Sequence, residues 1–208
     1  MTVEAVLFDF DGTLAHTEPA YRRAYREMMF RFAGVEVDER EISRFINMTA
    51  SEFAAMFPSP EMLARFEEVY HETHHDSIAA IEGIPELLAA LRVAGLPLAV
   101  VSLKPRRAGE LELDLTGLRQ YVDAAVWGDD GPPPKPAPDA AIEAAFRLGV
   151  EPARTLVVGD SASDIFMARA AGIPAAGALW GGAPRDRLVA AGAETLLDTP
   201  SDLLELLS

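Results

Sequence analysis

The later part of the chain alternates short apolar runs with segments of helical periodicity, beginning at about Ile84. This alternation is typical of a parallel sheet whose strands are joined by crossover helices. The expected strands are residues 3–10, 98–102, 124–127, 155–158, 175–179 and 194–197. The expected helices are residues 84–94, 106–113, 138–148, 163–171 and 185–191. The pattern predicts an α/β fold with a Rossmann-like open parallel sheet.

Residues 17–77 interrupt this alternation, because their apolar positions follow helical spacing and include no convincing strand. The expected helices here are residues 20–32, 39–46, 51–56 and 61–76. We therefore expect residues 1–15 and 82–208 to form the α/β core and residues 16–81 to form an inserted all-helical cap domain. The insertion is expected over the edge where the strands end, the edge at which open α/β sheets bind ligands, so it could act as a lid.

Composition narrows the class of protein. The chain has 208 residues, half of them hydrophobic, which is enough for one core and a small inserted module. The formal net charge of −15 disfavours nucleic acid and anionic membranes as partners. No cysteine is present, which excludes disulfides and cysteine nucleophiles. With no apolar run of bilayer length and no signal-like N-terminal segment, we expect a cytoplasmic protein, either a monomer or a homodimer.

Two carboxylates follow the first expected strand in the segment Asp9-Phe10-Asp11-Gly12-Thr13. Alternate residues of a strand point to the same side, so Asp9 and Asp11 are expected to be presented together. Carboxylates held close together disfavour each other's charged form unless a cation compensates them. A hard cation such as Mg²⁺ is therefore expected between them.

Polar residues at the ends of later segments fit the same chemistry. Ser102 closes one strand and could donate to a phosphate oxygen, and Asp160 closes another and could join the metal. Ser161 and Asp164 follow, and they could orient these groups, reach the metal or cap the next helix. Only two of the 18 basic residues are lysines, Lys104 and Lys135. Lys135 lies among prolines that stiffen its loop, so it is expected to point at a carboxylate or phosphate.

In this set of motifs the chain resembles the haloacid dehalogenase superfamily, and within it the phosphatases with a small helical cap, such as the phosphoglycolate phosphatase group. The resemblance covers essentially the whole chain. Asp9 to Leu14 resemble the first motif, Ser102 the second, Lys135 to Asp139 the third, and Gly159 to Asp164 the fourth. One position departs from many members: Leu103 follows Ser102 where asparagine is common, which removes a possible polar contact.

The resemblance implies a Mg²⁺-dependent phosphatase that hydrolyses a small phosphate monoester, with 2-phosphoglycolate as the leading candidate. Asp9 would attack phosphorus and form an aspartyl phosphate, and Asp11 would protonate the leaving oxygen and then activate water. The metal would be held by Asp9, the backbone carbonyl of Asp11 and Asp160. The phosphate would be bound by Lys135, Ser102 and the backbone of Gly12 and Thr13.

Two other functions use similar core residues. A sugar phosphomutase of the beta-phosphoglucomutase type would differ in its cap, around residues 47–51. A phosphoacceptor signalling domain also places acids, a hydroxyl and a lysine at the strand ends of an open sheet, but the helical insertion and a base at Asp11 argue against it. The segment His71-Glu72-Thr73-His74-His75 could hold a metal, because His71 and His75 are four residues apart on a helix, but we favour a solvated helix surface for this segment.

Overall fold

The structure is a computed structural model that describes residues 2–46, 48 and 50–207. It divides into two compact units, one that runs to His16 and resumes at Ala79, and a second comprising Thr17–Ile78. The first unit contains a short antiparallel ribbon of β2 (Ala15–His16) and β3 (Ala79–Ala80), the two places where the chain passes between the units.

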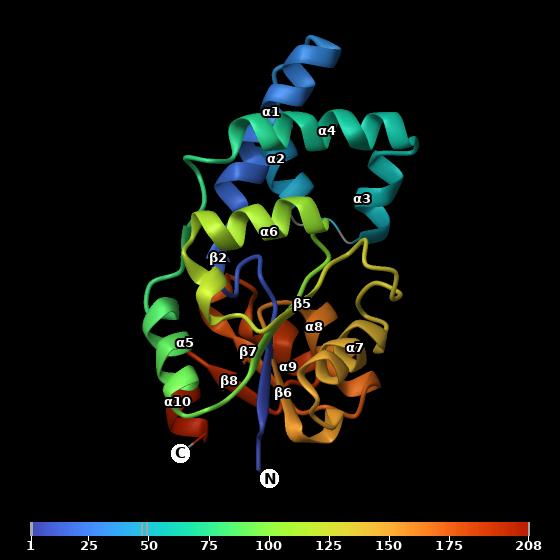
Figure 1. Cartoon of the computed structure of the whole chain (residues 1–208). Helices are drawn as coiled ribbons and strands as arrows, with labels where there is room; N and C mark the ends of the chain where they lie inside the picture. Colours follow the sequence, from blue (N-terminus) through green and yellow to red (C-terminus); the bar gives the residue numbers. More distant parts are fainter. Residues whose placement is uncertain (1, 47, 49, 208) are drawn as a thin grey trace. The chain divides into compact units, whose positions relative to one another are not determined.

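The first unit is built on a six-stranded sheet in the order β5-β4-β1-β6-β7-β8, with all neighbouring strands parallel (Figure 1). The strands are β1 (Ala5–Phe8), β4 (Leu98–Val101), β5 (Ala124–Val126), β6 (Thr155–Gly159), β7 (Ala175–Ala178) and β8 (Thr195–Leu197). From β1 the chain moves outward to β4 and β5, and then returns to build β6, β7 and β8 on the other side. The strand order therefore reverses between β1 and β6, the position at which such sheets bind ligands.

The central strands are continuous apolar runs because both of their faces are covered. Every residue of β1, β4 and β6 is buried. The remaining elements of the unit are α5 (Ile84–Val93), α6 (Arg106–Leu115), α7 (Asp139–Leu148), α8 (Ala162–Ala170), α9 (Arg185–Ala191) and α10 (Asp202–Leu207). Side chains of α7, α8 and α9 pack on one face in a shared cluster with Leu7, Val101 and Val157. Figure 1 shows α5 and α10 on the other side of the strands from α7.

The second unit contains α1 (Glu18–Ala33), α2 (Glu39–Ile46), α3 (Ala50–Met56) and α4 (Pro60–Thr73). Its core is aromatic: the Tyr25 and Phe45 rings stack with centroids 4.2 Å apart, and Phe66 contacts both Phe45 and Phe57. Offset and edge contacts of this kind add to the stabilisation that apolar burial gives. The expected fold class, an open parallel sheet with an inserted helical unit, is confirmed.

The differences from the expected elements are local. The first strand ends at Phe8 rather than at residue 10, so both aspartates that follow lie in a loop. The short ribbon of β2 and β3 and the helix α10 were not predicted, because segments of two to six residues are too short to show a period. Within the described part of the chain, every helix is too short or too polar to serve as a membrane-spanning segment.

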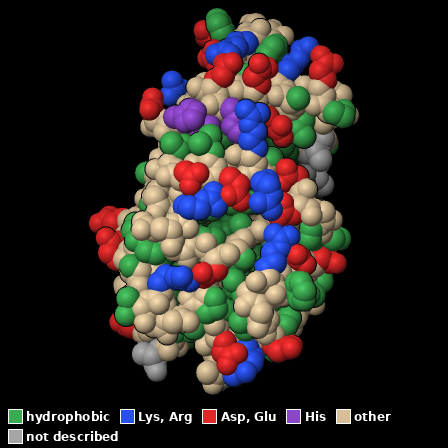
Figure 2. Space-filling view, in the orientation of Figure 1, with side chains coloured by type: hydrophobic (Ala, Val, Ile, Leu, Met, Phe, Trp, Pro, Cys, Tyr) green, Lys and Arg blue, Asp and Glu red, His purple; other side chains and the backbone are tan. Residues whose placement is uncertain are grey.

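The histidine-rich end of α4 is only partly solvated. Histidine side chains are visible on the face drawn in Figure 2, and His75 is exposed as expected. The expectation is wrong for His74, which is buried, with its ring stacked 5.0 Å from that of Tyr70 and its Nδ1 2.8 Å from the Tyr70 carbonyl oxygen. Among the described residues, the group of side chains that could hold a metal is a set of aspartates in the other unit, not these histidines.

The packing of α6 generates a prediction about stability. Gly109 lies against the indole of Trp127, and a Cβ at this position would be 2.2 Å from Trp127 Cζ3. Helix propensity alone favours alanine over glycine by about 1 kcal/mol, but forcing a methyl group into a packed core costs about 1–3 kcal/mol. Because Trp127 is itself buried, we expect Gly109→Ala to lower the free energy of unfolding in urea, followed by far-ultraviolet circular dichroism.

The matched control is Arg107→Ala, which changes an exposed residue of the same helix and should alter the free energy of unfolding by less than about 0.5 kcal/mol. A gain of stability in Gly109→Ala would contradict the packing described for Trp127.

Candidate active site

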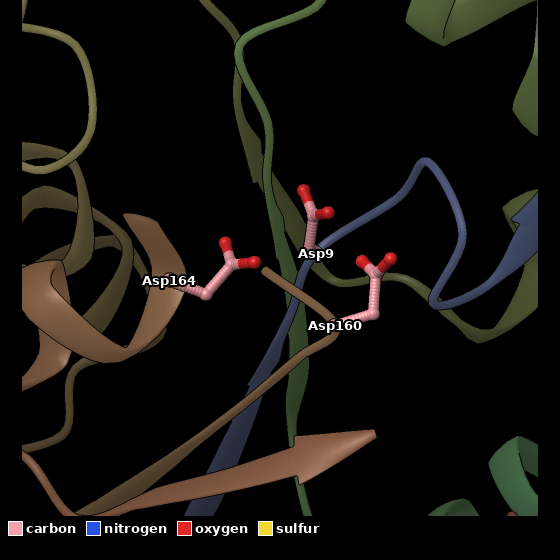
Figure 3. A group of neighbouring side chains, drawn as sticks. All are labelled: Asp9, Asp160 and Asp164. Carbon is pink, nitrogen blue, oxygen red and sulfur yellow. The ribbon is translucent and has the colours of Figure 1, made fainter. Parts of the chain in front are cut away.

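Three aspartates meet where β1 and β6 end. Asp9 follows β1, Asp160 follows β6, and Asp164 lies in the first turn of α8. One carboxylate oxygen of each lies within 4.8 Å of the others (Figure 3). Asp9 lies close to the other two aspartates because β1 and β6 are neighbouring parallel strands, so their ends lie side by side.

The ammonium group of Lys135 lies between two of these carboxylates. Its Nζ is 2.7 Å from Asp9 Oδ1 and 2.5 Å from Asp164 Oδ1. The lysine is 4% exposed, so these contacts replace water almost completely. A buried charge requires such partners, and these two contacts orient Lys135.

Burial and crowding disfavour the charged forms of the acids. Burial, together with the charge of Asp164, raises the pKa of Asp9 to about 7, although Lys135 opposes the shift. Burial and the charges of Asp9 and Asp164 raise the pKa of Asp160 well above its usual range, and the Thr13 hydrogen bond opposes this. Burial works to lower the pKa of Lys135, but Asp164 and Asp9 outweigh it and the net shift is upward. The lysine therefore stays charged.

The donor set fits a divalent cation. Three carboxylates and one ammonium carry a formal charge of −2 in a site with little access to water. Carboxylate oxygens are the ligands that Mg²⁺ prefers, and a 2+ ion would balance this charge. The side chains that could hold it are those of Asp9, Asp160 and Asp164. The sequence placed Asp9, Asp160 and the Asp11 carbonyl at the metal, with Asp164 as a residue that could also reach it.

The two carboxylate oxygens of Asp164 have different partners. Its Oδ2 accepts hydrogen bonds from the Ser161 hydroxyl at 2.5 Å and from the Ser161 backbone N–H at 3.1 Å, which caps α8. Its Oδ1 accepts from Lys135. The capping interpretation of this segment is therefore correct, and Ser161 fixes the carboxylate that contacts Lys135.

Close backbone approach explains two glycines at the site. Gly12 has a φ of 78°, and a Cβ there would lie 2.5 Å from Asp160 Oδ2. A Cβ at Gly181 would lie 2.2 Å from Asp160 Cβ. The Gly12 N–H, expected near substrate, donates to the Ala15 carbonyl at 2.9 Å. The lack of a side chain at Gly12 leaves space for the Asp160 carboxylate.

Thr13 is fully buried, and its hydroxyl donates to Asp160 Oδ1 at 3.0 Å. The Trp180 indole N–H donates to the Thr13 carbonyl at 2.9 Å, which ties this loop to the end of β7. The Thr13 side chain therefore orients Asp160.

Ser102 follows β4 and is 5% exposed. Its Oγ accepts the backbone N–H of Lys104 at 3.2 Å, which leaves the hydroxyl hydrogen to donate elsewhere. Ser102 can therefore still donate one hydrogen bond.

Asp11 lies apart from the aspartate cluster and is paired with the other lysine. Lys104 Nζ is 2.9 Å from Asp11 Oδ1 and 2.6 Å from Glu112 Oε2. Glu112 was missed by the sequence analysis, although it occupies the buried face of α6 one position before Leu113. The sequence did contain a sign of this ion pair: Glu112 is an acid on an otherwise apolar helix face, in a chain that has only two lysines.

A match to a family model identifies the family of the chain. The model described as haloacid dehalogenase-like hydrolase matches residues 6–178, and the chain belongs to this family. The expected enzyme class, a phosphatase, is confirmed by the relatives that follow.

The curated relatives extend over almost the whole chain. An N-acetylmuramic acid 6-phosphate phosphatase of Pseudomonas aeruginosa is 33% identical and covers 100% of this chain and 96% of its own length. A phosphoglycolate phosphatase of Cupriavidus necator is 33% identical over 98% of this chain and 93% of its own. A pyrophosphatase of Bacillus velezensis, PpaX, is 30% identical over 98% and 96%.

Solved structures agree with this fold over the full length. A candidate phosphoglycolate phosphatase of Lactobacillus plantarum superposes with a TM-score of 0.86 at 28% identity, covering 99% of this chain and 100% of its own. A candidate beta-phosphoglucomutase of Thermotoga maritima gives 0.82 at 28% identity, covering 99% and 98%. A family hydrolase of Deinococcus radiodurans, solved with bound phosphate and sodium, gives 0.77 at 29% identity, covering 99% and 95%.

The raised pKa of Asp9 predicts how stability depends on pH in the absence of metal. The folded protein binds the Asp9 proton more tightly than the unfolded chain, since the pKa rises from 3.8 to about 7. Stability from this group is therefore lost as pH rises between those values, by an amount on the order of a few kcal/mol. Asp9→Asn carries no such proton, so its melting temperature in EDTA should exceed that of the wild type increasingly from about pH 4 to about pH 8.

The control is the same series of melting temperatures for the wild type with Mg²⁺ added. A bound cation should reduce the loss of stability at high pH. A difference between variant and wild type that shrinks as the pH rises would show that the Asp9 pKa is not raised.

Proposed function

We propose that this protein is a Mg²⁺-dependent phosphatase that hydrolyses a small phosphate monoester through an aspartyl phosphate on Asp9. The observation that carries the proposal is the buried cluster in which Lys135 contacts both Asp9 and Asp164 beside Asp160. A cluster with this charge is suited to holding a cation and an anionic phosphate together.

The metal, when bound by the aspartates, would withdraw charge from the phosphoryl oxygens and so reduce repulsion of the nucleophile. Lys135 keeps Asp9 in place and supplies a fixed positive charge next to the attacking carboxylate. Ser102 donates its hydroxyl hydrogen to a second phosphoryl oxygen. The chain thereby divides one displacement into two, first by Asp9 and then by water.

Asp11 is the proposed general acid and base. Its side chain is 31% exposed, in contrast to the buried cluster, so it can reach the bridging oxygen of an ester. As the bond from phosphorus to this oxygen breaks, the bonding electrons stay on the oxygen and Asp11 supplies its proton. The same carboxylate then takes a proton from the water that attacks the aspartyl phosphate.

2-Phosphoglycolate is the first substrate to test, because a relative at 33% identity carries that activity in its name. A second candidate is a sugar phosphomutase activity, favoured by the similarity to the Thermotoga maritima structure. The segment expected to separate the two, residues 47–51, includes Asn47 and Thr49, which lie outside the described residues. Three phosphatases among the relatives favour hydrolysis.

The proposal predicts metal-dependent release of phosphate. A panel of 2-phosphoglycolate, N-acetylmuramic acid 6-phosphate, pyrophosphate and hexose phosphates would be assayed with Mg²⁺ and with EDTA. We expect release from at least one ester with Mg²⁺ and a loss of at least about a hundredfold with EDTA. Turnover of a hexose 1-phosphate only when a hexose bisphosphate is added would favour the mutase, and release that EDTA leaves unchanged would contradict the metal.

Removing the nucleophile tests the covalent mechanism. Asp9→Asn keeps the shape of the side chain but cannot attack phosphorus, so kcat should fall at least about a thousandfold while the circular dichroism spectrum is retained. Asp186→Asn, an exposed aspartate in α9, is the matched control and should keep wild-type kcat. Undiminished turnover by Asp9→Asn would refute the aspartyl phosphate.

A further inference from the structure

Lys104, the other lysine of the chain, forms a buried ion pair that has no role in the reaction proposed above. The Lys104 side chain is 0% exposed, as is that of Glu112, and Nζ is 2.6 Å from Glu112 Oε2. The same Nζ is 2.9 Å from Asp11 Oδ1 and lies 5.5 Å from the centroid of the Phe10 ring. A charged group held on these sides has little freedom to move.

Backbone contacts fix the loop that carries this lysine. The Lys104 N–H donates to Ser102 Oγ at 3.2 Å, and the Lys104 carbonyl accepts from Gly128 N at 2.9 Å. A Cβ at Gly128 would lie 2.1 Å from the Leu103 carbonyl oxygen, so the loops after β4 and β5 touch directly. Lys104 is therefore positioned by the same loop that positions the proposed phosphate-binding hydroxyl.

Exposure distinguishes the two partners of Lys104. Asp11 is 31% exposed and Lys104 is fully buried, so the lysine is placed to act through Asp11 rather than on a substrate. Glu112 balances the charge of Lys104 whether Asp11 carries a proton or not. The contact with Asp11 can therefore persist while Asp11 alternates between acid and base.

The ion pair with Lys104 distinguishes the two carboxylate oxygens of Asp11. An ammonium group is only a donor, so the Asp11 Oδ1 that faces Lys104 must accept. When Asp11 is protonated, its hydrogen then belongs on Oδ2. The pair fixes both the orientation of the carboxyl group and the oxygen from which a proton is given.

We propose that Lys104, held in place by Glu112, is a positioning residue that orients Asp11 for proton transfer to the leaving oxygen. This inference rests on the proposed function, because it assigns a second residue to the acid step of that reaction. It applies to the step in which the ester bond breaks, where orientation of the acid lowers the barrier.

The dependence of rate on the leaving group tests this inference. An alkyl phosphate releases an alkoxide that needs a proton, whereas acetyl phosphate releases acetate, which does not. For both substrates kcat/KM reports only the steps up to release of the leaving group, so later hydrolysis of the aspartyl phosphate does not affect it. We would compare acetyl phosphate with the best alkyl ester of the panel.

Lys104→Met should lower kcat/KM for the alkyl ester at least about tenfold and for acetyl phosphate less than about threefold. Asp11→Asn should show the same selectivity to a larger extent, and Arg107→Gln, which removes an exposed cation from α6, should affect neither substrate. An equal fall for both substrates, or no fall for either, would overturn the inference. A wild-type protein that hydrolyses neither substrate would refute the proposed function itself.

A double variant tests whether Lys104 positions Asp11 or only neutralises Glu112. Lys104→Met leaves a buried acid without its charge partner, whereas Lys104→Met/Glu112→Gln removes both charges and should restore the melting temperature. If Lys104 positions Asp11, the double variant stays at least about tenfold slower on the alkyl ester and near wild type on acetyl phosphate. Recovery of the alkyl activity to the wild-type level would show that Lys104 serves only to neutralise Glu112, and would overturn the proposal.

Discussion

The contact of one buried ammonium group with two carboxylates is the interaction on which this site depends. Lys135 lies 2.7 Å from Asp9 and 2.5 Å from Asp164, and it joins the loop after β1 to the first turn of α8. Without it, three acids would share a site from which water is largely excluded, at a high electrostatic cost. The remaining negative charge makes the site suitable for a divalent cation.

The parallel sheet makes this arrangement possible. Its strand order reverses between β1 and β6, so the ends of these two strands present Asp9 and Asp160 side by side. Ser161 fixes Asp164 by capping α8, and Thr13 fixes Asp160, so each acid has a hydrogen-bonding partner that sets its direction. Both lysines of the chain are buried against acids, Lys135 in this cluster and Lys104 beside Asp11. The proposed nucleophile and the proposed acid are thus each paired with a different lysine.

Much of this arrangement could be predicted because strand ends are visible in the sequence. The apolar runs before Asp9, Ser102 and Asp160 placed all three residues at one edge of the sheet, and the prolines around Lys135 marked an ordered lysine. Glu112 could not be placed, because its contact depends on how α6 is rotated about its axis. The Thr13 hydroxyl donates to Asp160 and the Gly12 N–H to the Ala15 carbonyl, and spacing alone does not determine these partners.

The central claim, that Asp9 is a covalent nucleophile, is tested most directly by stereochemistry at phosphorus. The measurement is hydrolysis of an ester with an isotopically chiral phosphoryl group in labelled water, followed by determination of the configuration of the phosphate released. Each in-line displacement inverts phosphorus, so attack by Asp9 and then by water predicts net retention. Net inversion would mean that water displaces the leaving group directly, and it would contradict the account.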